Sequence, residues 1–147
     1  MRAPAISIRP YAVLLAVLAA LFLLRVAGQA LVAFAGTPGL PPMGEWYSGL
    51  MPYSLLLPAQ VLILGVQGWM CADFARGDGY WVRPRPRLGQ WLARASYVYA
   101  GAMAVRYVVT MALHPERRWL GTGTIPIVFH WVLAVYLFTF ARFHTRR

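Results

Sequence analysis

The sequence has few charged residues, very few acidic ones and a single cysteine. Only 12% of its 147 residues are charged, whereas a soluble domain of this length would have about 25%. So few charges cannot cover a water-facing surface, which argues against an ordinary soluble domain. Cys71 has no second cysteine to pair with, so a disulfide, a CxxC redox pair and a thiolate metal cage within one chain are excluded.

The sequence also lacks the common catalytic motifs. It has no HExxH, nucleophile elbow, P-loop, GxGxxG context or paired carboxylates. All 14 basic residues are arginine, against four acidic residues, which gives a net charge of +10. An excess of basic over acidic residues can indicate nucleic-acid binding. Here, however, the arginines form short groups next to apolar runs, which is typical of membrane topology signals, and we expect no nucleic-acid partner.

Four segments are long and apolar enough to cross a bilayer as helices, which takes roughly 17–25 residues. They cover residues 11–35, 53–75, 88–113 and 125–143. The first is longer than the core of a signal peptide, about 7–15 residues, and contains Arg25, so we interpret it as a retained helix. The sequence predicts an all-α membrane protein, a four-transmembrane-helix bundle that forms a single integral membrane domain over residues 1–147.

The distribution of arginine predicts the orientation, because basic residues in short loops stay on the cytoplasmic side. The N-terminal tail, the Arg/Pro loop 76–87 and the C-terminal end carry most of the arginines outside the spans. The outer loop 36–52 has none, and the outer loop 114–124 has two. Both termini and the Arg/Pro loop are therefore predicted to be cytoplasmic. Arginine used uniformly in place of lysine indicates a GC-rich genome, and the expected location is the bacterial cytoplasmic (inner) membrane.

Each predicted span contains polar side chains that lipid cannot satisfy. At about 1.5 Å per residue, one polar side chain of each span falls roughly 8–10 Å below the outer end of its helix. These four side chains are Gln29, Gln60, Arg106 and His130. Arg25 lies one turn deeper on the face of Gln29, and Gln67 lies two turns below Gln60. Such side chains should face the interior of the bundle and form a buried polar layer.

The two intramembrane arginines require partners. An arginine at mid-membrane costs roughly 2.5–3.5 kcal/mol on insertion scales. No acidic residue lies in the outer half of any span, so Glu45 in the apolar loop 36–52 is the nearest counter-charge for Arg25 or Arg106. The alternatives are carbonyl groups at helix ends or an external anion, such as a phospholipid headgroup or a carboxylate. Glu45 would lock a scaffold, whereas an external anion would make the layer a binding site. In the same loop, Trp46 and Tyr47 are expected at headgroup depth.

His130 allows several interpretations. A transmembrane histidine can donate a hydrogen bond in the core, relay protons, or ligate haem or a chlorophyll-type pigment. His114 and His144 both fall near helix ends, so a bis-histidine haem site within one chain is not favoured. Single ligation of a pigment by His130, or a haem shared between two copies, stays open. The sequence identifies no particular cofactor and no metal site.

Three classes of function are compatible with these features. The leading interpretation is a non-catalytic accessory or stabilising subunit, or a lipid-interacting component, of a larger membrane assembly. An alternative is a homo-oligomeric transporter or channel whose buried arginine, glutamine and histidine side chains contact an anionic or polar ligand. A third is a lipid-processing enzyme that uses His130 or His114 with arginines. The expected partners are the lipid bilayer and either other membrane subunits or further copies of the chain.

Overall fold

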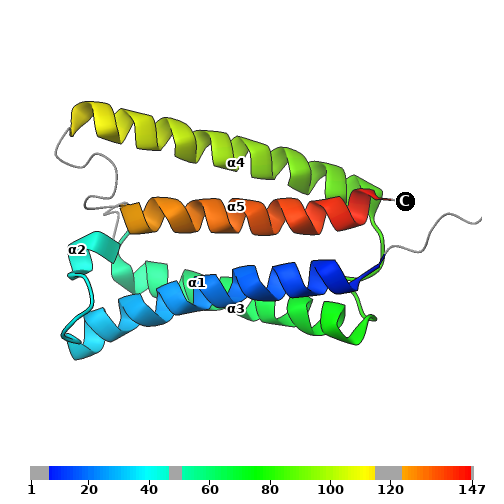
Figure 1. The fold of residues 1–147 in the computed structure, drawn as a ribbon, viewed down its shortest axis with the longest axis horizontal. Coiled ribbons are helices and arrows are strands. Elements are labelled where there is room, and N and C mark those ends of the chain that lie inside the picture. The colour runs from blue at the N-terminus through cyan, green and yellow to red at the C-terminus, as the bar shows by residue number, and fades with distance from the viewer. Residues whose placement is uncertain (1–6, 47–50, 115–123, 147) are drawn as a thin grey trace, which may run out of the picture.

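The computed structural model describes residues 7–46, 51–114 and 124–146. These residues form helices and contain no strand (Figure 1). The helices are α1 (Arg9–Ala35), α2 (Met43–Trp46), α3 (Tyr53–Arg76), α4 (Pro86–Leu113) and α5 (Thr124–Thr145). Tyr47 and nearly all of the predicted outer loop 114–124 lie outside the described residues.

Three of the long helices, α1, α3 and α5, are long and apolar enough to cross a membrane, and they indicate an integral membrane protein. The helix α4 is the longest, with 28 residues, but it is not among the three. Arginines and other polar side chains, Arg106 and Tyr107 among them, dilute its apolar character along its length. The prediction of a span over residues 88–113 therefore stays a prediction.

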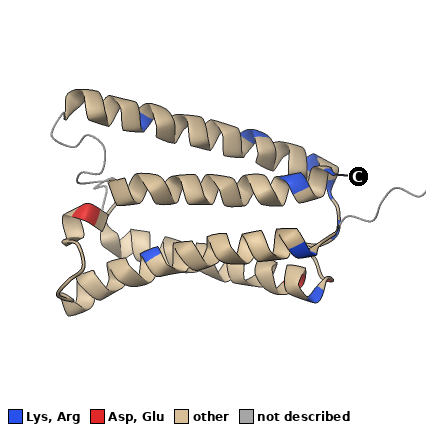
Figure 2. Cartoon of the chain, in the orientation of Figure 1, with Lys and Arg blue, Asp and Glu red and all other residues tan. Residues whose placement is uncertain are grey.

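The long helices run side by side in alternating directions (Figure 1). The central helix is α5, which packs against α4 on one side and against α1 on the other, and α1 packs against α3. The start of α1, the end of α5 and the loop between α3 and α4 lie at one end of the bundle, which we call the basic end (Figure 1). Most arginines of the described residues gather there (Figure 2). The opposite end carries α2, and we call it the α2 end.

The hydrophobic core fills the basic end. Its buried side chains come from α1, α3, α5 and the loop after α3: Leu15, Leu18, Met70, Phe74, Val82, Tyr136, Phe140 and Phe143. The ring of Phe74 lies 6.0 Å from that of Phe140 and 4.7 Å from that of Phe143, measured between centroids. These aromatic contacts hold α3 against α5 at this end.

The loop after α3 is fastened by Asp73, whose side chain is 2% exposed. Arg76 donates to its Oδ1 at 2.6 Å, and the backbone N–H of Trp81 donates to its Oδ2 at 3.2 Å. The chain then enters α4 at Pro86, a position at the start of a helix where proline is well tolerated. The last two residues of the predicted loop 76–87 are therefore already helical.

Candidate functional site

The backbone carbonyl of Trp46 in α2 gathers polar side chains at the α2 end. Arg25 of α1 donates to it through Nη2 at 3.1 Å, and Gln29 donates through Nε2 at 3.4 Å. Gln60 of α3 in turn donates through Nε2 to Oε1 of Gln29 at 3.2 Å. All four residues are buried. This chain of hydrogen bonds ties α2 to α1 and α3.

The indole ring of Trp46 is packed inside the protein. It lies directly on Gly28 of α1, where an added Cβ would stand 2.6 Å from the nearest ring carbon. Its Nε1 donates to the carbonyl of Pro41 at 2.9 Å. Trp46 is only 8% exposed, which differs from the expectation that it meets lipid headgroups. Because Gly28 has no side chain, the Trp46 ring can pack directly against the backbone of α1.

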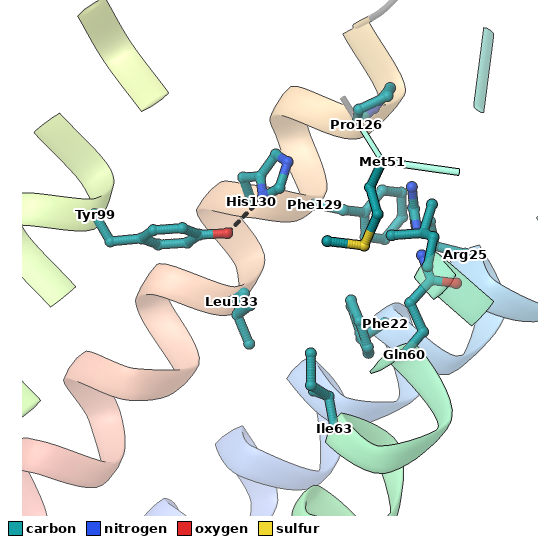
Figure 3. Close-up of a pocket in the computed structure, with 11 residues that line it drawn as sticks. Phe22, Arg25, Met51, Gln60, Ile63, Tyr99, Pro126, Phe129, His130 and Leu133 are labelled. Carbon is teal, nitrogen blue, oxygen red and sulfur yellow. Dashed lines mark hydrogen bonds between the residues drawn. The ribbon is translucent and has the colours of Figure 1, made fainter. Parts of the chain in front are cut away.

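A cavity of about 240 Å³ lies beside this cluster (Figure 3). It is lined by Phe22, Arg25, Met51, Leu56, Gln60, Ile63, Tyr99, Pro126, Phe129, His130 and Leu133. Arg25 and Gln60 stand on one side and His130 on the other, where Tyr99 reaches it from α4 (Figure 3). The Tyr99 hydroxyl and Nδ1 of His130 share a hydrogen bond of 2.5 Å. Polar groups from four helices thus meet around one small space with otherwise apolar walls.

Two polar atoms of the lining residues are buried and have no hydrogen-bond partner among the described residues. They are Nε of Arg25 and Oε1 of Gln60. The hydroxyl of Tyr53, which lies within electrostatic range of Arg25, is also buried and has no hydrogen-bond partner among the described residues. Leaving such a group unsatisfied costs about 1–3 kcal/mol, and more when it is charged. The cavity wall therefore has unused hydrogen-bonding capacity of both kinds, donor and acceptor.

Arg106 of α4 is half-buried and lies within electrostatic range of Tyr99 and His130. Arg25 acts on His130 from the other side of the cavity. The structure thus places Arg25 and Arg106 around the same histidine, although no hydrogen bond joins Arg106 to the buried cluster among the described residues. Two guanidinium groups near one apolar cavity give it a positive potential.

Glu45 is not paired with Arg25 or Arg106 in the described part of the chain. Its side chain is half-buried on α2 and forms no ion pair among the described residues, whose two ion pairs join Arg76 to Asp73 and to Asp78. The carbonyl of the next residue, Trp46, occupies the position beside Arg25 that the sequence suggested for a carboxylate. A carbonyl group satisfies one N–H of the guanidinium but leaves its positive charge in place.

Gln67 is not part of this cluster. It lies two turns further along α3 and is 3% exposed, and its Oε1 has no hydrogen-bond partner among the described residues. It lines a separate apolar groove between α3 and α5. The polar layer expected from the sequence is therefore divided between two places in the structure.

The hypothesis that His130 ligates a cofactor stays a prediction. Its Nδ1 is engaged with Tyr99, so Nε2 is the ring nitrogen that a cofactor would use. His144 lies at the basic end, where its Nδ1 accepts a hydrogen bond of 3.2 Å from the N–H of Arg85. Within the described ranges, no group of three or more metal-binding side chains comes together.

The cavity lining combines apolar side chains with four that can form hydrogen bonds. Its lining residues include an arginine, a glutamine, a histidine and a tyrosine, and no carboxylate or thiol. Such a set suits the recognition of an anion that carries apolar substituents. Comparison of the chain with protein-family models, curated proteins and solved structures found no match.

Proposed function

We propose that this protein binds a small amphiphilic anion in the cavity between α1, α3 and α5. The proposal rests on the buried guanidinium of Arg25, which has no carboxylate partner among the described residues and carries an unpartnered Nε at the cavity wall. A carboxylate or phosphate there would accept a hydrogen bond from Arg25. Hydrogen bonds to charged groups contribute about 1.5–3 kcal/mol each.

We place the site in a four-span protein of the bacterial cytoplasmic membrane, with both termini on the cytoplasmic side. The 28 residues of α4 would measure about 42 Å, which exceeds the roughly 30 Å of the hydrocarbon core. Ser96, Tyr99 and Arg106 are buried or half-buried on α4, whereas Val98 and Val105 are exposed. Over this part of α4, the side with these polar residues is thus covered by protein and the side with the two valines is free for lipid. The arginines of the basic end favour a cytoplasmic position for that end.

Replacing Arg25 with methionine tests the proposal. We expect decanoate to bind the parent protein more tightly than neutral decanol does, and Arg25→Met to weaken decanoate binding by about 10- to 100-fold, because one charge-assisted hydrogen bond is lost. Binding is measured by calorimetry on protein in phosphatidylcholine nanodiscs.

The matched control is Arg94→Met. Arg94 is an exposed arginine of α4 that does not line the cavity, so this variant loses the same charge without touching the site. Equal affinity of the parent for decanoate and decanol, or equal losses in the two variants, would contradict the proposal.

A second role, as an accessory subunit of a larger membrane assembly, is favoured by the outer face of α4. This helix packs against α5 alone among the described helices. Trp91 is 70% exposed and Tyr97 66% exposed, and the guanidinium of Arg94 lies 5.8 Å from the Trp91 ring. An exposed arginine with aromatic neighbours is a composition that protein interfaces favour.

The accessory role predicts that larger membrane proteins co-purify with the tagged chain in a mild detergent. We expect the double variant Arg94→Met, Trp91→Ala to lose most of this material, as measured by quantitative mass spectrometry, because the aromatic and arginine anchors of an interface carry much of its energy. The Arg25→Met variant should still co-purify with the same membrane proteins. Recovery of the same proteins with the α4 variant would count against an interface on this face.

A further inference from the structure

An apolar groove between α3 and α5 adjoins the cavity. The groove has a volume of about 340 Å³ and is lined by Leu62, Ile63, Val66, Gln67, Met70, Leu133, Tyr136 and Leu137. Two of these residues, Ile63 and Leu133, also line the cavity. The groove therefore lies next to the cavity and runs along the helices toward the aromatic core at the basic end.

The groove exists because α3 packs against α1 and not closely along α5. Near the basic end the ring of Phe74 bridges α3 and α5, but this contact lies beyond the groove. Leu62 is 70% exposed and Val66 is 40% exposed, so the groove opens sideways. In a membrane this opening would face the hydrocarbon chains of the bilayer.

Two residues of the groove lining, Gln67 and Tyr136, carry polar side-chain atoms, and the Tyr136 hydroxyl donates to the sulfur of Met70 at 3.7 Å. Oε1 of Gln67 is buried and has no hydrogen-bond partner among the described residues. Gln67 is seven residues from Gln60, which corresponds to about 10 Å along the helix. A plain hydrocarbon chain in the groove would leave this acceptor unpaired, whereas a hydroxyl or amide N–H at that distance from the cavity would satisfy it.

We infer that the ligand is a single-chain anionic lipid whose head lies at Arg25, and whose chain follows the α3–α5 groove and carries a hydrogen-bond donor near Gln67. This inference rests on the proposed anion site and adds the class of molecule that occupies it. The molecule enters from the bilayer through the open side of the groove. Its carboxylate or phosphate is held by Arg25, and its chain donor is held by Gln67.

Mapping where the hydrocarbon chain of the ligand lies tests the inference directly. Hydrocarbon in the groove replaces hydrocarbon in the bilayer, so burying the chain adds little affinity, and its place must be mapped. Octadecanoate and octadecyl phosphate, each with a diazirine in mid-chain, are photo-crosslinked to the protein in phosphatidylcholine nanodiscs. We expect both to label the α3–α5 groove residues, Val66 and Leu137 among them. The more efficient of the two identifies the head as carboxylate or phosphate.

A groove-filling variant accompanies this mapping. We expect Val66→Trp to reduce the groove labelling at least fivefold, whereas Val98→Trp should leave it unchanged, because Val98 is 73% exposed on α4. Labelling confined to exposed residues such as Val98 overturns the inference. If decanoate binding still depends on Arg25 in that case, the anion site stands and only the course of the chain is wrong.

The donor on the chain is tested by affinity. We expect octadecanoate with a mid-chain hydroxyl to bind about fivefold more tightly than octadecanoate itself, in line with one net hydrogen bond. Gln67→Leu should remove this difference while leaving the dependence on Arg25 intact. Equal binding of the two acids by the parent protein overturns the assignment of Gln67.

Discussion

Replacing Gly28 with leucine is expected to remove the polar wall of the cavity and to destabilise the protein by about 1–3 kcal/mol, the usual cost of overpacking. An added Cβ would lie 2.6 Å from the Trp46 ring. The ring cannot yield without also losing its hydrogen bond to the carbonyl of Pro41. Moving Trp46 withdraws the carbonyl that accepts hydrogen bonds from Arg25 and Gln29.

The measurement combines thermal unfolding in a mild detergent with decanoate binding. We expect Gly28→Leu to lower the Tm and to lose most of the decanoate affinity, because Arg25 is no longer held in place. Gly65→Leu on α3 is the matched control, since a Cβ there meets nothing within 4 Å. Similar Tm and binding values for the two variants would show that the contact between Trp46 and Gly28 does not support the cavity.

Replacing Gly79 with valine is expected to release the loop between α3 and α4 at the basic end. Gly79 has a φ of +120°, a conformation that costs other residues about 1–3 kcal/mol. A Cβ at this position would also overlap the carboxylate of Asp73. That carboxylate accepts hydrogen bonds from Arg76 and from the N–H of Trp81. The substitution therefore adds backbone strain at residue 79 and displaces the carboxylate that anchors the loop.

The expected result is a lower Tm together with faster cleavage of the loop by trypsin, because exposed arginine-containing loops are preferred cleavage sites once their anchoring is lost. Gly101→Val, on the exposed face of α4 where an added Cβ has open space, should behave as the parent protein does. Decanoate binding should persist in Gly79→Val, because the cavity lies at the other end of the bundle. Unchanged cleavage in Gly79→Val would refute the role assigned to this turn.

The sequence by itself determined the helices, because their signals are local. Long apolar runs broken by glycine and proline predicted helical segments whose ends differ from those of α1, α3, α4 and α5 by no more than two residues. The same runs indicated an integral membrane protein, in agreement with the three helices that are apolar enough to span. The polar side chains within the runs could be assigned to the interior, since lipid offers them no hydrogen bonds.

Only the tertiary structure decided which polar groups meet. Glu45 was the natural counter-charge for Arg25 in the sequence, yet the group beside Arg25 is the carbonyl of Trp46. Every residue has such a carbonyl, so no pattern of side chains marks the one that will be used. Its position depends on the packing of the Trp46 ring against Gly28, a contact between segments 18 residues apart in the chain. Among the described residues, that packing leaves the charge of Arg25 without a carboxylate partner, which makes the buried polar cluster a candidate anion site.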